Sequence, residues 1–80
     1  MNRTEITQIA LNRIAAIRDG IIECNRELLA TGEFTETPEI TPEMLIDLAT
    51  DDVIDDPPVD VTIYDLVRIA QEISRIAPHI

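Results

Sequence analysis

The sequence predicts an all-α protein: a small helical bundle of a long N-terminal helix, a short middle helix and a C-terminal helix. Residues 4–31 and 61–77 repeat apolar side chains at intervals of three and four, which places them on one helix face. Fourteen residues are isoleucine and only Phe34 and Tyr64 are aromatic, a composition typical of bundles and coiled coils. We expect one domain, residues 1–80, completed by oligomerisation because so short a chain builds a small core.

The N-terminal helix, about residues 4–31, has the most regular pattern. Its main apolar seam consists of Ala10, Ile14, Ile17, Ile21, Cys24 and Leu28. Asn2 or Thr4 can cap its start, and Glu5 follows Asn2 by three residues as in a capping box. Gly32 marks the end, where helices often finish in a left-handed residue. A helix of about 28 residues is roughly 42 Å long.

A second stripe on this helix predicts an oligomer interface. It lies about 100° around from the main seam, and one helix with two apolar faces needs two neighbours. Gly20, in mid-helix, is either a tolerated weak point or a place where another backbone approaches closely. We expect a homodimer in which Arg18 pairs with an acid across the interface. The interface residues are Leu11, Ala15, Arg18, Ile22 and Leu29.

The middle helix is predicted from the stretch TPEITPEM, residues 37–44, which repeats a helix-start signal. A helix starting at Pro38 would have to include Thr41, but the residue before a proline avoids the α region. The second copy therefore starts the helix, with Thr41 as the cap and Pro42 as the first residue. We expect about nine residues, roughly 14 Å, covering the part of the first helix that the C-terminal helix leaves open.

The C-terminal helix is predicted over about residues 61–77. Asp60 or Thr62 can cap its start, and Pro78 closes its end. Its seam is Ile63, Leu66, Ala70, Ile73 and Ala77, and Val67, Ile69 and Ile76 widen the apolar arc to nearly half the circumference. Charges of alternating sign, at Asp65, Arg68, Glu72 and Arg75, are typical of a solvated helix face.

Negative charge is concentrated in the acidic connector, about residues 33–60, that holds the short helix. The net charge is −10, and residues 33–65 contain eleven acids without lysine or arginine. The acids are Glu33, Glu36, Glu39, Glu43, Asp47, Asp51, Asp52, Asp55, Asp56, Asp60 and Asp65. They form either a solvated connector or a surface that attracts a basic protein. A calcium loop of the EF-hand type would need glycine at its sixth position and glutamate at its twelfth, whereas the sixth position of a loop that starts at Asp51 is Asp56.

The charge pattern predicts a protein-binding module. We expect the acidic segment to engage a basic, nucleic-acid-binding protein as an inhibitor that occupies its binding groove. The predicted partner-binding residues are Asp47, Asp51, Asp52, Asp55, Asp56 and Asp60. The alternative is a structural or assembly adaptor that acts through the isoleucine-rich interface, with the acids serving solubility.

Enzymatic activity is not expected. His79 is the only histidine and Ser74 the only serine, and the one cysteine, Cys24, lies in the apolar seam. The chain has no nucleophile and base pair, no zinc cluster and no glycine-rich phosphate loop, so we expect neither a cofactor nor a metal. Direct nucleic-acid binding is disfavoured by the charge. Charges interrupt every apolar run, so we expect no membrane segment. A single cysteine allows no disulfide within the chain, which fits a reducing compartment, so we expect a cytoplasmic location.

Overall fold

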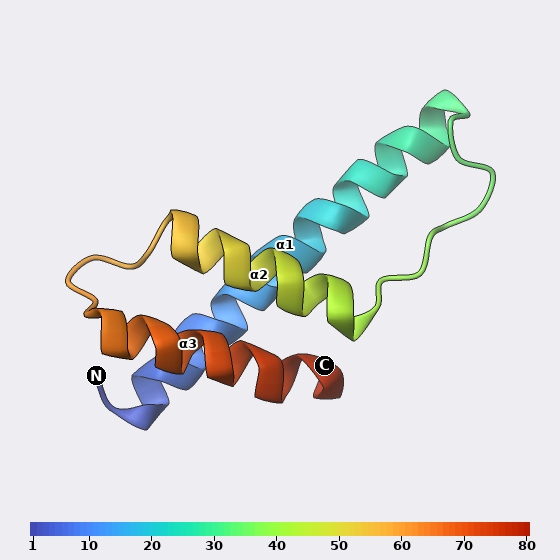
Figure 1. Ribbon diagram of the computed structural model, residues 1–80. Helices are drawn as coiled ribbons and strands as arrows, with labels where there is room; N and C mark the ends of the chain where they lie inside the picture. The colour runs from blue at the N-terminus through green and yellow to red at the C-terminus, as the bar shows by residue number, and fades with distance from the viewer.

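The computed structural model describes all residues, 1–80, as three α-helices without a strand (Figure 1). The helices are α1 (Arg3–Thr31), α2 (Pro42–Asp55) and α3 (Ile63–Ile76), followed by the 3-10 helix η1 (Ala77–His79). The predicted all-α class and order of helices are confirmed. None of the helices is both long and apolar enough to cross a membrane.

Each α-helix begins with a polar side chain that accepts a hydrogen bond from a backbone N–H in its first turn. The pairs are Asn2 with Glu5 at 2.8 Å, Thr41 with Met44 at 3.3 Å and Thr62 with Asp65 at 3.1 Å. The prediction that the second copy of the repeated signal starts α2 is therefore confirmed. Gly32 ends α1 with φ of 83°, a left-handed conformation that glycine adopts without steric cost.

The predicted length of the middle helix is wrong, since α2 has 14 residues and not about nine. Its additional turns carry Val53, which is fully buried, and Asp52, which pairs with Arg13 of α1. These tertiary contacts outweigh the weak helix propensity of aspartate and the repulsion within the acidic run. The middle and C-terminal helices are thus equally long.

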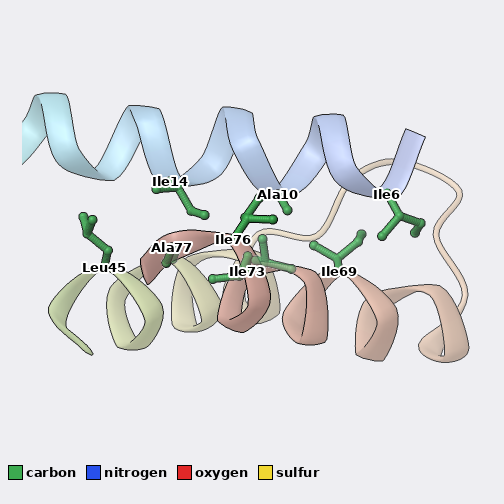
Figure 2. Packing of buried hydrophobic residues seen from close by; sticks show 10 residues of the cluster. Ile6, Ala10, Ile14, Leu45, Ile69, Ile73, Ile76 and Ala77 are labelled. Carbon is green, nitrogen blue, oxygen red and sulfur yellow. The ribbon is translucent and has the colours of Figure 1, made fainter. Parts of the chain in front are cut away.

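The core lies where all three helices meet, along the first half of α1 (Figure 2). Each helix contributes apolar residues spaced three or four apart, so that they share one face. The members are Ile6, Ala10 and Ile14 from α1, Leu45, Ala49 and Val53 from α2, Ile69, Ile73 and Ile76 from α3, and Ala77. No polar or charged residue is buried.

The buried face of α3 differs from the predicted seam. It is centred on Ile69, Ile73 and Ile76, whereas Ile63 is 83% exposed. Because the apolar arc covers almost half of the helix, the pattern alone did not determine which edge faces the core. On the side of α3 that faces α1, Glu72 accepts a hydrogen bond from Thr7 of α1 at 3.4 Å.

The second half of α1 extends beyond the other helices (Figure 1). We expected α3 and α2 to cover α1 one after the other, but they pack side by side against its first half. The short connection of residues 56–62 holds them as an antiparallel pair. The main seam is therefore buried only at Ala10 and Ile14, is half-buried at Ile17 and Ile21, and is exposed at Cys24.

The molecule is consequently open and elongated. Its radius of gyration is 14.2 Å, compared with about 11.6 Å for a typical 80-residue domain. Its accessible surface is 5456 Å², whereas a typical monomer of 9.0 kDa exposes about 4,850 Å². The chain therefore exposes about 600 Å² more than a typical monomer of its mass.

Candidate protein interaction surface

Three aspartates form a row along the exposed side of α2, which we call the acidic ridge: Asp47, Asp51 and Asp55. Their spacing of four residues places them on one face of the helix, and all three are exposed. The opposite face carries Leu45, Ala49 and Val53 in the core, as the amphipathic sequence of α2 requires. The carboxylates are thus held on a rigid element and directed away from the core.

Asp52 is placed differently from its neighbours, because it faces α1. Its Oδ2 accepts a hydrogen bond from Nη1 of Arg13 at 2.8 Å, and its side chain is 43% exposed. This ion pair neutralises the Asp52 carboxylate and links α2 to α1. Of the six predicted partner-binding residues, Asp52 is the only one with a cationic partner.

Asp56 and Asp60 lie in the connection after α2 and do not continue the ridge. Asp56 is the C-terminal cap of α2, and its N–H donates to the carbonyl of Asp52 at 2.9 Å. Asp60 has a φ of 62°, a left-handed conformation that aspartate adopts more readily than most residues. Both side chains are exposed, so they extend the negative surface beyond the end of the helix.

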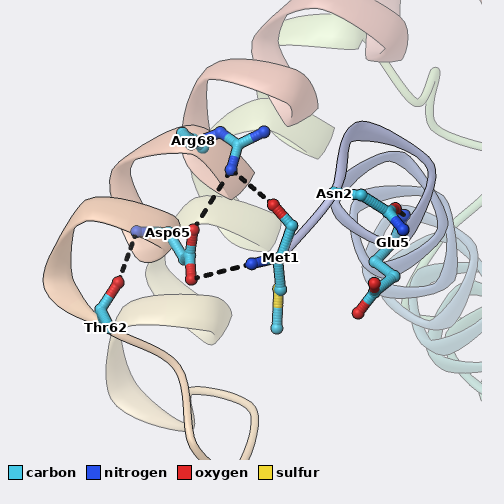
Figure 3. Close-up of polar contacts among 6 residues, drawn as sticks. All are labelled: Met1, Asn2, Glu5, Thr62, Asp65 and Arg68. Atoms are coloured by element: carbon cyan, nitrogen blue, oxygen red, sulfur yellow. Dashed lines mark hydrogen bonds and ion pairs between the residues drawn. The ribbon is translucent and has the colours of Figure 1, made fainter.

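Most of the acids between residues 33 and 65 have no cation beside them. Only Asp52 and Asp65 form ion pairs, the latter with Arg68 at 3.3 Å and with the amino group of Met1 at 3.6 Å (Figure 3). The other nine are unpaired. The surplus negative charge of the sequence is therefore displayed to the solvent.

Two grooves border the acidic ridge. The α2–α3 groove is lined by Ile46, Asp47, Thr50, Asp51, Val67, Ala70, Gln71 and Ser74. The α1–α2 groove is lined by Ala16, Ile17, Gly20, Ile21, Cys24, Leu48, Asp52 and Asp55. Each groove combines apolar side chains with two aspartates of α2. Val67 in the α2–α3 groove is 50% exposed, and Leu48 in the α1–α2 groove is 43% exposed. The sequence did not lead us to predict these grooves. The apolar arc of α3 was the available signal, because it is too wide to be covered by one neighbouring helix.

The five predicted oligomer-interface residues lie on one side of α1, outside the core. Leu11, Ala15 and Ile22 are exposed, whereas Arg18 and Leu29 are half-buried. The segment before α2 borders this side at its far end, where a third groove forms. That groove is lined by Ile22, Asn25, Arg26, Leu29, Thr37 and Ile40. Gly20 has no atom of another segment near the position of a Cβ, so no backbone approaches it within one chain.

Glu72 lies at the contact between α1 and α3, and its pKa is lowered. Glu72 accepts a hydrogen bond from Nε of Arg75 at 2.8 Å, and this bond is the main cause that lowers the pKa of Glu72. Thr7 and the charge of Arg3 act in the same direction. Glu72 and Arg75 thus form a structural ion pair within α3, and the hydrogen bond from Thr7 links Glu72 to α1.

No group of three or more histidine, cysteine, aspartate or glutamate side chains is placed to hold a metal ion. The sole cysteine is exposed and without a neighbouring histidine. No protein-family model matches the chain, and no curated protein or solved structure is significantly similar to it.

Proposed function

We propose that the protein is a small, non-enzymatic binding module that engages a basic protein through the acidic ridge and its two bordering grooves. The observation that carries the proposal is the row of Asp47, Asp51 and Asp55, unpaired and held on a helix between apolar grooves. Charge and apolar surface together define the chemistry of the partner. It presents apolar side chains flanked by lysine or arginine.

An amphipathic basic helix fits this description best. Its apolar face would bury Val67 and Ala70 in the α2–α3 groove, or Leu48 and Ile17 in the α1–α2 groove, in the manner of helix-in-groove recognition. Its cationic flanks would meet the acidic ridge from either side. Long-range attraction to an uncompensated negative surface raises the association rate and makes it sensitive to salt.

The concrete form that we propose is an inhibitor of a nucleic-acid-binding protein. Such proteins hold phosphates with lysine and arginine side chains. Three carboxylates fixed along one face of α2 would compete with the phosphates for these lysine and arginine side chains. The helix holds the carboxylates in place, whereas a loop would leave them flexible. The partner would then lose access to nucleic acid while it is bound.

Affinity capture from the native host tests this proposal with two variants that have the same net charge. The test variant is Asp47→Asn/Asp51→Asn/Asp55→Asn, and the control variant is Glu33→Gln/Glu36→Gln/Glu39→Gln. Each removes three of the ten surplus negative charges and leaves −7. We expect the wild type and the control to capture the same basic protein, and the ridge variant to lose it. The purified partner should release labelled nucleic acid when the wild type is titrated in.

A partner that the ridge variant retains would contradict the proposal. So would a captured protein that binds nucleic acid equally well in the presence of saturating wild type, which would refute the inhibitor form specifically.

A second function, assembly through the isoleucine-rich side of α1, is favoured by one observation. Ile22 and Cys24 are exposed in the second half of α1. The molecule as a whole exposes about 600 Å² more surface than a typical monomer of its mass. If this is the primary function, Ile22→Glu will abolish partner capture and the ridge variant will preserve it. The same capture experiment therefore distinguishes the two functions.

A further inference from the structure

We propose that two copies of this chain pair antiparallel through one face of α1, which we call the pairing face. Its members are Leu11, Ala15, Arg18, Ile22, Asn25 and Leu29. This inference does not depend on the acidic ridge, because the ridge and the pairing face share no residue. It commits to one occupant, a second copy, and to one orientation.

The spacing of the pairing face is symmetric, which is the first argument for a second copy. Its residues follow intervals of four, three, four, three and four. In an antiparallel pair centred near residue 20, Leu11 of one copy therefore opposes Leu29 of the other, Ala15 opposes Asn25, and Arg18 opposes Ile22. Every position has a counterpart, as a two-fold axis requires, and the seam follows the heptad spacing of coiled coils.

The shape of the surface provides the second argument. The third groove lies around Leu29 at the far end of the pairing face, bordered by Ile40 of the segment before α2. Leu11, at the near end, is 36% exposed and projects outside the core. In the antiparallel register Leu11 of each copy reaches the groove of the other. Each chain thus supplies one protruding side chain, Leu11, and one groove, so the two copies fill the groove at each end of the interface.

Charge complementarity is the third argument. Asp19 and Arg26 flank the pairing face on the same edge, and both are exposed and without an ion pair. Helical side chains incline toward the N-terminus of their own helix. In the antiparallel register Asp19 of one copy and Arg26 of the other therefore converge, and symmetry creates the pair twice. A parallel pair would instead place this edge of the two copies on opposite sides of the interface, where Asp19 and Arg26 could not meet.

The position of the remaining charge is compatible with this pairing. Residues 1–32 contain four arginines and four acids, so α1 brings no net charge to the interface. Arg13, which contacts α2, lies about 160° around α1 from the centre of the pairing face. The acidic ridges of the two copies consequently face away from the dimer axis.

Sedimentation equilibrium of four purified proteins tests the proposal: the wild type, Ile22→Glu, Asp19→Arg, and Asp19→Arg/Arg26→Asp. The wild type should be a dimer. Ile22→Glu should raise the dimer dissociation constant about 100-fold, since each of two sites loses about tenfold. Asp19→Arg should raise the constant about tenfold, and the double variant should restore it to about the wild-type value. Circular dichroism checks that each variant keeps its helices.

Three results would overturn the inference. The first is a wild type that stays monomeric up to about 1 mM. The second is a folded Ile22→Glu variant that dimerises like the wild type. The third is a double variant that is as weak as Asp19→Arg alone, because only an antiparallel pair exchanges these two charges. If Ile22→Glu does not fold, the two charge variants, both at exposed positions, decide the question.

Discussion

Two adjacent aspartates of α2 should affect stability in opposite directions when each is changed to asparagine. Asp51 has like charges four residues away on both sides, Asp47 and Asp55, and no cationic partner. Each such pair destabilises a helix by about 0.2–0.5 kcal/mol, so Asp51→Asn should stabilise the fold by about 0.4–1 kcal/mol. For a chain of this size, that raises the melting temperature by about 2–8 °C.

Asp52→Asn should instead destabilise the protein, because it removes the ion pair with Arg13. That pair is partly exposed, with side-chain exposures of 43% for Asp52 and 22% for Arg13, so its coupling energy is about 0.5–1 kcal/mol. A double-mutant cycle with Arg13→Gln isolates this coupling from the repulsion that Asp52 also experiences.

Urea unfolding, followed by circular dichroism at matched protein concentration, measures both effects. The stabilisation by Asp51→Asn should shrink as salt is added, since the Debye length falls from about 10 Å at 0.1 M to about 3 Å at 1 M. Stabilisation by both variants would refute the placement of Asp52 against α1. A stabilisation by Asp51→Asn that salt leaves unchanged would show that the repulsion along the ridge is not its cause.

Three further predictions concern the fold. Thr41→Ala should destabilise the protein by about 1 kcal/mol through loss of the α2 cap. Thr37→Ala, in the other copy of the motif, should change the stability by less than about 0.5 kcal/mol. Thermal unfolding of the two variants compares these effects. Ile14→Ala should destabilise by about 3 kcal/mol because Ile14 is fully buried where three helices meet, which urea unfolding measures. Arg75 lowers the pKa of Glu72 from 4.5. The charged form of Glu72 therefore contributes stability above pH 4.5, and this contribution is lost as the pH falls through the lowered pKa. Glu72→Gln should be less stable than the wild type at pH 7, and urea unfolding should give the two proteins the same free energy of unfolding in acid.

Much of the fold was predictable from local signals. The caps act within a few residues, Thr41 through its hydroxyl group and Gly32 through its left-handed backbone, so the residue types near each end located the helix ends. The amphipathic spacing likewise predicted the all-α class. These features depend only on neighbouring residues, which a sequence states directly.

The arrangement of the helices was less predictable, because it depends on contacts between distant residues. Local propensity predicted that α2 ends early, but burial of Val53 extends it to Asp55. The apolar arc of α3 was too wide to indicate its buried edge. The acidic residues were visible in the sequence, yet their division into the ridge and the Asp52–Arg13 pair required the relative position of α1 and α2.

The presence of an unpaired acidic row is physically informative, since relief of its repulsion should increase stability. A surface that lowers stability is more readily explained by binding than by folding. Solubility alone requires negative charge but does not require three aspartates on one face between two apolar grooves.

The most direct test is the affinity of the captured partner for the wild type, the ridge variant and the control variant, measured by calorimetry at about 50 and 200 mM salt. We predict that the ridge variant binds at least about tenfold more weakly than the control at the lower salt and shows a shallower dependence on salt. Equal affinities and equal salt dependence for the two variants, which carry the same net charge, would contradict the account.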